Sequence, residues 1–322
     1  MNKLIVCLTT GMLALAMVAG CGRSAPKTAV PVTQRFIGLA TGETSGTYYP
    51  LGAALAGLLN KDVPGLNVSV QSSPGAVANI ELLASGKAEL AFVQSDIAYY
   101  AANGLEMYQG KPVANLTGLA SLYAETVQLV TLEASGFKTI GALKGRRIAV
   151  GPVGSGTEAN ARQILELHGI TYKDIAVQNL PFKEAIAALR DGRVDAAFVT
   201  AGYPTAAIFD IAAQKKLALL PLEPARLDTL IAKYPFYTVA TIPAGTYPGV
   251  DKAVVTVSVR ALLVATDKVD AELGYKISKA LYANPDRLHA AHAQGVNVTK
   301  ATAQTGMTLP LNAGAEKFYQ EK

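Results

Sequence analysis

IGLATGETSGT, residues 37–47, is a short β-rich run that ends in a Ser-Gly-Thr turn, and IAVGPVGSGT, residues 148–157, repeats that pattern further along the chain. A helical pattern follows each turn. The two segments also end alike, because LASGKAELAFV over 83–93 and LRDGRVDAAFV over 189–199 share the sequence G-[KR]-x-[ED]-x-A-F-V. The repeat predicts two α/β units of similar size in tandem, and therefore two lobes. The alternative is a chance similarity between two ordinary α/β stretches.

Short apolar runs alternate with helical patterns from the start of the first unit. Such β-α-β alternation is typical of mainly parallel sheets covered by helices. The predicted strands are Phe36–Ala40, Leu66–Gln71 and Ala88–Val93, and the predicted helices are Tyr48–Leu59 and Ala76–Ala84.

Extended segments are also predicted between and after the two units. Leu116–Leu122 and Val127–Leu132 are strand-like and are separated by Tyr123–Thr126, while Ala253–Ala265 is a long apolar, β-branched run. If the chain crosses between lobes near residue 125 and returns near 254, two crossing strands would form a hinge.

The N-terminal segment has the pattern of a lipoprotein signal. Lys3 precedes an apolar run, Leu4–Ala19, and the sequence Val-Ala-Gly-Cys ends at Cys21. A membrane-spanning helix is the alternative, but the run is shorter than the ~20 residues that a span needs. We expect residues 1–20 to be a signal peptide, Cys21 to carry the lipid, and residues 21–34 to tether the domain to the membrane.

Composition argues against several classes of function. The net charge of +5 comes from scattered residues, so we expect no nucleic-acid binding. Apart from Cys7 and Cys21 the chain has no cysteine, so a mature domain would have no disulfide. We find no catalytic, nucleotide-binding or metal-binding motif, and expect neither enzyme activity nor a cofactor or metal. His289 and His292 have the spacing of a metal pair, but an exposed helix face explains them better.

Turns that follow strands and open helices are the predicted binding elements. They present unpaired backbone N–H groups and the positive end of the helix dipole, where small anions bind. The alternative role for each turn is a simple helix cap. The candidates are Thr44, Ser45, Gly46, Thr47 and Tyr48 in the first unit, and Gly154, Ser155, Gly156 and Thr157 in the second.

Further candidates follow other strands or lie near the crossings. Strand ends in open α/β sheets are where ligands bind, and a tyrosine can line a pocket while donating one hydrogen bond. Helix caps and ordinary packing are the alternatives. These candidates are Ser73, Gln94, Ser95, Asp96, Gly202 and Tyr203 at strand ends, and Tyr123 and Tyr237 near the crossings.

Several motifs resemble one known family. FIGLATGETSGTYYPLG over 36–52 is similar to the opening of the TAXI proteins, the solute receptors of one class of tripartite ATP-independent periplasmic (TRAP) transporters. The similarity continues through AFVQSD, VGSGTE, AAFVTAGYPT and IPAGTY and covers nearly the whole chain after the signal segment. The motifs contain no arginine, so a bound carboxylate would depend on backbone and hydroxyl donors.

The resemblance implies an α/β, two-lobed periplasmic-binding-protein fold (class II-like) with two crossing hinge strands. It implies a small organic-acid ligand such as glutamate or 2-oxoglutarate and a TRAP membrane permease as partner. The predicted crossings near residues 125 and 254 give one lobe formed by 35–124 plus 255–322 and another formed by 125–254. We expect a monomer, exported and lipid-anchored at the periplasmic or outer face of the cytoplasmic membrane. The alternatives are a receptor of an ATP-driven (ABC) importer for sulfonates or nitrogenous compounds, a protein that presents its solute to a sensor and, least favoured, an enzyme on the same scaffold.

Overall fold

The computed structural model describes residues 34–321. The predicted signal peptide, the lipidation site Cys21 and the tether up to residue 33 lie outside the described residues. Within the described range, no helix has both the length and the apolar character needed to cross a membrane.

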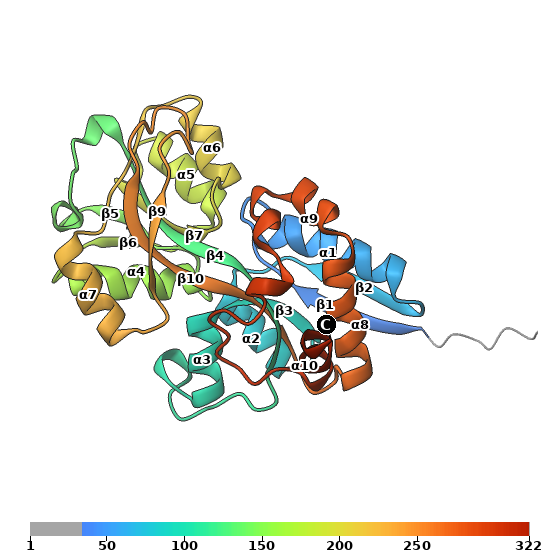
Figure 1. The fold of residues 1–322 in the computed structure, drawn as a ribbon. Helices are drawn as coiled ribbons and strands as arrows, with labels where there is room; N and C mark the ends of the chain where they lie inside the picture. The colour runs from blue at the N-terminus through green and yellow to red at the C-terminus, as the bar shows by residue number, and fades with distance from the viewer. Residues whose placement is uncertain (1–33, 322) are drawn as a thin grey trace, which may run out of the picture. The chain divides into compact units, whose positions relative to one another are not determined.

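Ten strands form one continuous sheet in the order β2-β1-β3-β10-β4-β7-β5-β6, with β8 paired to β4 and β9 paired to β10 (Figure 1). The strands are β1 Arg35–Ala40, β2 Leu66–Gln71, β3 Leu90–Gln94, β4 Thr117–Leu132, β5 Arg147–Ala149, β6 Ala176–Gln178, β7 Ala196–Ala201, β8 Leu217–Leu219, β9 Thr238–Ile242 and β10 Val254–Ala265. The helices are α1 Tyr48–Asp62, α2 Ala76–Ala84, α3 Ser95–Asn103, α4 Gly156–Leu167, α5 Phe182–Arg190, α6 Ala206–Ala212, α7 Pro224–Lys233, α8 Ala271–Ala283, α9 Pro285–Ala291 and α10 Ala313–Gln320.

The predicted tandem repeat is confirmed by the strand order. The first unit runs β1-α1-β2-α2-β3 and the second β5-α4-β6-α5-β7. In each unit the first strand lies between the other two and is parallel to both. The repeated motif also occupies the same place, since Leu39 pairs with Leu90 and Ile148 pairs with Ala196. Sequence similarity therefore corresponds to equivalent topology.

The two crossing strands are β4 and β10, which pair antiparallel in the middle of the sheet. The prediction of a break at Tyr123–Thr126 is wrong, because β4 continues through this segment. The polar residues there are accommodated within the strand: Glu125 accepts hydrogen bonds from tyrosine side chains, and Thr126 lies opposite both Ala201 and Ser258.

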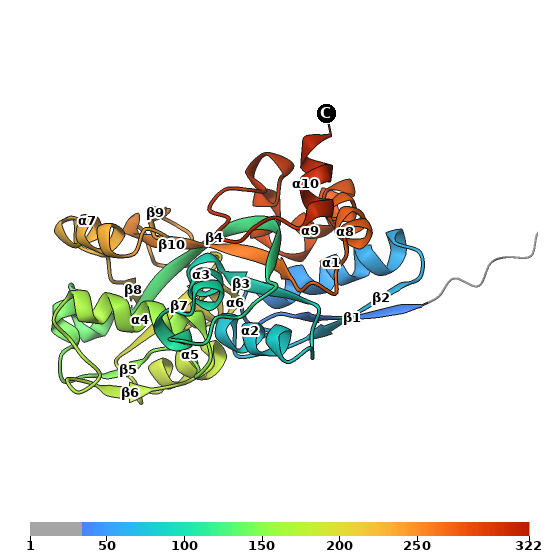
Figure 2. The ribbon, with the colours of Figure 1, turned by 90° about the horizontal axis from the view of Figure 1, so that it is seen from below.

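Figures 1 and 2 show β4 and β10 as long ribbons running from one lobe to the other. We call the elements on one side of these crossings lobe 1 (β1–β3, α1–α3 and α8–α10) and those on the other side lobe 2 (β5–β9 and α4–α7). Most buried side chains cluster within one lobe: one cluster of lobe 1 includes Leu39 and Phe92, and one of lobe 2 includes Ala197 and Ile208. A further cluster of lobe 1 also takes in Ala159 of α4. β10 pairs with β9 over Val254–Ser258 and with β3 over Ala261–Ala265. Each lobe thus has a core, and the two cores meet at α4.

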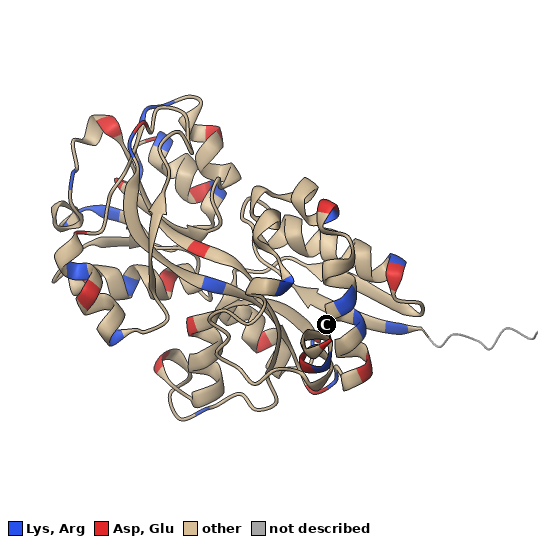
Figure 3. Ribbon diagram, viewed as in Figure 1, with Lys and Arg blue, Asp and Glu red and all other residues tan. Residues whose placement is uncertain are grey.

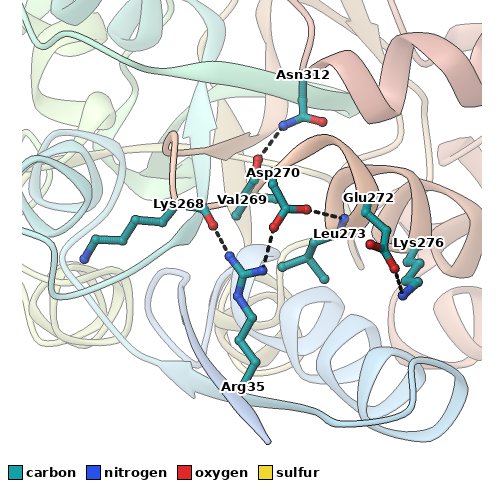
Figure 4. A network of polar contacts seen from close by, with 8 residues as sticks. All are labelled: Arg35, Lys268, Val269, Asp270, Glu272, Leu273, Lys276 and Asn312. Carbon is teal, nitrogen blue, oxygen red and sulfur yellow. Dashed lines mark hydrogen bonds and ion pairs between the residues drawn. The ribbon is translucent and has the colours of Figure 1, made fainter. Parts of the chain in front are cut away.

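A polar network joins the start of lobe 1 to its C-terminal helices (Figure 4). Asp270 caps α8 by accepting a hydrogen bond from the Leu273 backbone N–H at 2.8 Å, and its other oxygen accepts one from Arg35 at 2.9 Å. Asn312, the cap of α10, donates to the Val269 carbonyl at 2.8 Å. The last helices are therefore fixed to lobe 1 although β10 carries the chain there from lobe 2.

Charged residues are scattered over both lobes along the ribbon in Figure 3 and form no single-sign stripe. Nucleic-acid-binding domains instead gather Lys and Arg on one face.

Candidate functional site

A hollow between the two lobes contains about 390 Å³ of empty space, part of it open to solvent. Its walls come from both lobes and from β4. The lining residues are Gly42, Glu43, Gly46, Thr47, Tyr48, Pro74, Gly75, Ala76, Gln94, Glu125, Ser155, Gly156, Thr157, Phe182, Thr200 and Ala201.

The lining consists largely of strand ends and helix starts. In lobe 1 it includes the starts of α1 and α2 and the last residue of β3, and in lobe 2 the starts of α4 and α5 and the last residues of β7. Because helix N-termini carry unpaired N–H groups, both walls can donate hydrogen bonds to an acidic group. Two of these starts already use an N–H group: Glu158 donates to the Ser155 hydroxyl at 3.1 Å, and Phe182 donates to Glu43.

The two walls are in direct contact. Thr47 donates its hydroxyl hydrogen to the Gly202 carbonyl at 3.1 Å, and the Ala78 backbone N–H donates to the Gly154 carbonyl at 2.9 Å. The Glu43 carboxyl accepts from the backbone N–H of Phe182, the first residue of α5, at 2.6 Å. The structure therefore shows the lobes closed on one another.

The structure brings seven of the sequence-predicted residues into this lining and places ten outside it. Those in the lining are Gly46, Thr47, Tyr48, Gln94, Ser155, Gly156 and Thr157. Those outside it are Thr44, Ser45, Ser73, Ser95, Asp96, Tyr123, Gly154, Gly202, Tyr203 and Tyr237.

Several of the outside residues form contacts that hold the walls in place. Ser73 is buried and bonds to Asn79, the Ser95 hydroxyl accepts from the Arg260 backbone N–H, and Gly154 and Gly202 accept the interlobe bonds described above. Thr44 is exposed and Ser45 half-buried.

A buried polar network behind the cavity joins the lobes. Asn160 of α4 donates to Asp96 at 2.9 Å and to the Tyr237 hydroxyl at 2.7 Å, and accepts from Gln94 at 2.8 Å. Tyr237 in turn donates to Gln163 at 2.8 Å. Burial raises the pKa of Asp96 to about 6, although hydrogen bonds to its carboxyl oppose the shift. The network positions Gln94 against the cavity.

Asn160→Ala is expected to destabilise the folded protein by about 2 kcal/mol, because it leaves the buried Asp96 and Tyr237 without their shared partner. The melting temperature should fall by roughly 5 °C in calorimetry. Asn103→Ala is the matched control, since Asn103 is exposed and its side chain makes one local hydrogen bond. Equal effects of the two substitutions would contradict a central role for Asn160.

Two carboxyl groups in the lining are absent from the sequence-predicted set. Glu125 projects from β4 and is 2% exposed, and its carboxyl accepts from the Tyr48 hydroxyl at 3.1 Å and from the Tyr123 hydroxyl at 3.4 Å. Burial raises its pKa to about 8. Burial likewise raises the pKa of Glu43 to about 7, opposed by the hydrogen bond from Phe182. The position of Glu125 at a predicted crossing was the only sequence signal that could have indicated it.

The lining contains no Lys, Arg or His side chain. Nor does any group of three or more His, Cys, Asp or Glu side chains in residues 34–321 have the arrangement of a metal site. The hollow is suited to a small polar solute that can donate hydrogen bonds to carboxyls and accept them from hydroxyl and N–H groups.

Two lobes, two crossing strands and an interlobe cavity define a periplasmic-binding-protein fold, and solved structures share it. A protein from Bordetella bronchiseptica is 18% identical to this chain, with a TM-score of 0.55. The match covers 86% of this chain and 83% of the Bordetella protein. The alkanesulfonate-binding protein SsuA from Xanthomonas axonopodis pv. citri, bound to MOPS, is 15% identical, with a TM-score of 0.50. The match covers 89% of this chain and 84% of SsuA. The ligand-binding component of an ABC-type import system from Staphylococcus aureus is 12% identical, with a TM-score of 0.50. The match covers 86% of this chain and 82% of the Staphylococcus protein.

A family model covers nearly all of the described chain. The chain belongs to the NMT1-like family, whose model matches residues 39–322.

Proposed function

We propose that this protein is an exported solute-binding protein that captures a small carboxylate-bearing solute, such as glutamate or 2-oxoglutarate, and delivers it to a membrane transporter. The observation that carries the proposal is the cavity between the contacting lobes, which is lined by helix starts from both lobes. A solute that bridges the two walls would stabilise the closed form by contacts that the open form lacks.

Two types of membrane transporter could receive the solute. The motifs around Phe36–Gly52 and Ala196–Thr205 support a TRAP permease of the TAXI class. The similarity in fold to an alkanesulfonate-binding protein and to an ABC import component gives more support to an ABC importer for sulfonates or nitrogenous compounds. Uptake measured in vesicles separates them, because an ABC importer requires ATP hydrolysis and a TRAP transporter requires an ion gradient.

Closure would occur about the two crossing strands. We propose that the lobes are those predicted from the sequence, 35–124 plus 255–322 and 125–254, except that the chain returns to lobe 1 a few residues later along β10. Val254–Ser258 still pairs with β9 of lobe 2, and Val259 lies opposite Glu125. We further propose that the receptor works as a monomer, attached to the membrane through lipid on Cys21.

A thermal-shift screen tests the proposed function. The purified protein is unfolded and refolded to remove any co-purified solute, then heated with amino acids, dicarboxylates, oxo acids, sulfonates and sugars. A ligand at 100 times its dissociation constant adds ~2.7 kcal/mol to the stability of the native state. A shift with a carboxylate supports the proposal. A shift with sulfonates alone would favour the alternative, and the absence of any shift would contradict a receptor for these solutes.

Ser155→Ala and Ser45→Ala form a matched pair in the same screen. Ser155 lines the cavity and caps α4, so its loss is expected to weaken binding about 5-fold or more, which corresponds to ~1 kcal/mol. Ser45 lies outside the lining, and its substitution should leave the affinity within about 2-fold. The sequence alone predicts that both serines contribute to binding. Equal losses of affinity in the two variants would support that prediction and contradict the different roles inferred from the structure.

A further inference from the structure

The cavity has an unusual balance of charge for a site that binds an acid. Glu43 and Glu125 are its ionisable acids, and no Lys, Arg or His lines it. A purely anionic solute would therefore meet two carboxyls and only neutral donors. Receptors for small anions more often provide an arginine, whose fork pairs with a carboxylate.

Glu125 retains unused capacity to accept hydrogen bonds. A carboxylate offers about four lone-pair sites, and this one receives only the two tyrosine hydroxyls. No Lys, Arg or His nitrogen in the described chain forms an ion pair with it. When ionised, Glu125 therefore has no paired cation within the described protein.

The groups that face Glu125 come from several elements. They are Tyr48 on α1, Tyr123 on its own strand, Asp96 on α3 and Arg260 on β10. Arg260 is the one cation among them, but its Nε donates to Ser121 at 2.9 Å and its side chain forms no salt bridge to Glu125. Asp96 adds negative charge nearby. Once Glu125 is ionised, it and Asp96 together carry more charge than Arg260, so this region favours the arrival of a positive group.

Two further side-chain atoms in the lining lack partners. One oxygen of Glu43 and the Thr200 hydroxyl are buried without a hydrogen bond. Buried polar atoms of native proteins are almost always satisfied, so these two indicate groups that a bound solute would meet. Glu43 can only accept when ionised, whereas Thr200 can donate.

We propose that the solute carries a protonated amino group that pairs with Glu125, while its acidic group accepts hydrogen bonds from Thr200 and from the start of α4. This inference rests on the proposed function and narrows its substrate class to amino acids or aminosulfonates. It excludes oxo acids and plain dicarboxylates. Because Glu125 lies on a crossing strand, the amino group would bind where the two lobes meet.

Matched sets of solutes test the proposal with the full protein. The sets are glutamate, 2-oxoglutarate and glutarate; alanine, pyruvate and propionate; and taurine, isethionate and ethanesulfonate. In at least one set the amino compound should bind roughly 10- to 100-fold more tightly than its analogues, as expected for a charged hydrogen bond. Equal or tighter binding of an analogue without an amino group would overturn the inference and leave the receptor function intact. Failure of all nine to bind would overturn both.

Glu125→Gln provides the second measurement, with exposed Glu316→Gln as the control for loss of one negative charge. Glu125→Gln should reduce the preference for the amino compound to about 3-fold or less and leave its analogue's affinity nearly unchanged, because only the ion pair is removed. An unchanged preference would contradict the assignment.

Calorimetry in buffers of different ionisation enthalpy gives an independent result. Burial raises the pKa of Glu125 to about 8, so the free protein carries a proton there at pH 7. Pairing with an ammonium group lowers that pKa, and binding should release close to one proton per solute, roughly 0.9 at pH 7. Glu125→Gln should abolish the release. Binding without proton release would indicate instead that no ammonium group pairs with this carboxyl.

Discussion

Raising the pH from 5 to 9 is expected to lower the thermal stability of the solute-free protein by several kcal/mol. Burial raises the pKa of Glu125 to about 8, that of Glu43 to about 7 and that of Asp96 to about 6. Between the ordinary and the raised pKa, the folded state holds a proton that the unfolded state has lost. Stability therefore falls as the pH rises through this window.

Glu125 should contribute the largest single share of this change. Each unit of pKa shift corresponds to ~1.4 kcal/mol, so its share is on the order of 4 kcal/mol, or about 10 °C in melting temperature for a domain of this size. Carboxyls with lowered pKa values, such as Asp174 beside Thr171, act in the opposite direction but below this pH range.

Calorimetry at pH 5, 7 and 9 checks this expectation. Glu125→Gln keeps the shape of the side chain but cannot titrate, so the loss of stability between pH 5 and 9 should be roughly half that of the unmodified protein. Glu43 and Asp96 account for the remainder. Exposed Glu316→Gln should leave the profile unchanged. A flat profile for the unmodified protein would mean that Glu125 is exposed or is paired with a compensating charge.

The fold was largely predictable because it depends on a pattern that occurs twice. The Ser-Gly-Thr turns and the two Ala-Phe-Val strands have fixed places in the repeated β-α-β-α-β unit. These motifs predict the parallel strands and the helix starts at the cavity, and this prediction needs no information about contacts between distant residues. The predicted bounds of β2 and α2 agree with the structure, since each is a clear apolar run or helical pattern between turn residues.

The chemistry of the cavity was less predictable, because it arises from residues far apart in the chain. Nothing near Glu125 in sequence shows that Tyr48 will reach it from α1, and the polar segment around it looks like a break in the strand. Glu43 belongs to the predicted motif, but its partner Phe182 comes from the other lobe. Tyr237 was expected near the cavity, and the structure instead places it in the buried network behind.

Gly156→Ala is expected to lower the affinity for the solute on the order of 100-fold while leaving each lobe folded. A Cβ on Gly156 would lie well inside van der Waals contact of the Gln94 side-chain amide, which reaches it from lobe 1. Gln94 is 3% exposed and bonded to Asn160, so it cannot move aside without breaking that bond. Overpacking of this kind costs about 1–3 kcal/mol, and here the cost falls on the closed form alone.

Gly57→Ala is the control, because a Cβ at Gly57 of α1 meets nothing within 4 Å. It should slightly stabilise the helix by about 0.5–1 kcal/mol and leave the affinity unchanged. Titration calorimetry measures both affinities, and X-ray scattering should show the Gly156→Ala protein more open at saturating solute.

A double-mutant cycle identifies the cause of the loss. If the clash with Gln94 prevents closure, Gly156→Ala should have little further effect in a Gln94→Ala background, because the space that the amide fills is then free for the new methyl group. Additive losses would show instead that Gly156 acts through the backbone N–H groups at the start of α4. Full affinity in the single Gly156→Ala variant would mean that the solute binds without the interlobe contact seen here, and closure would then not be the binding mechanism.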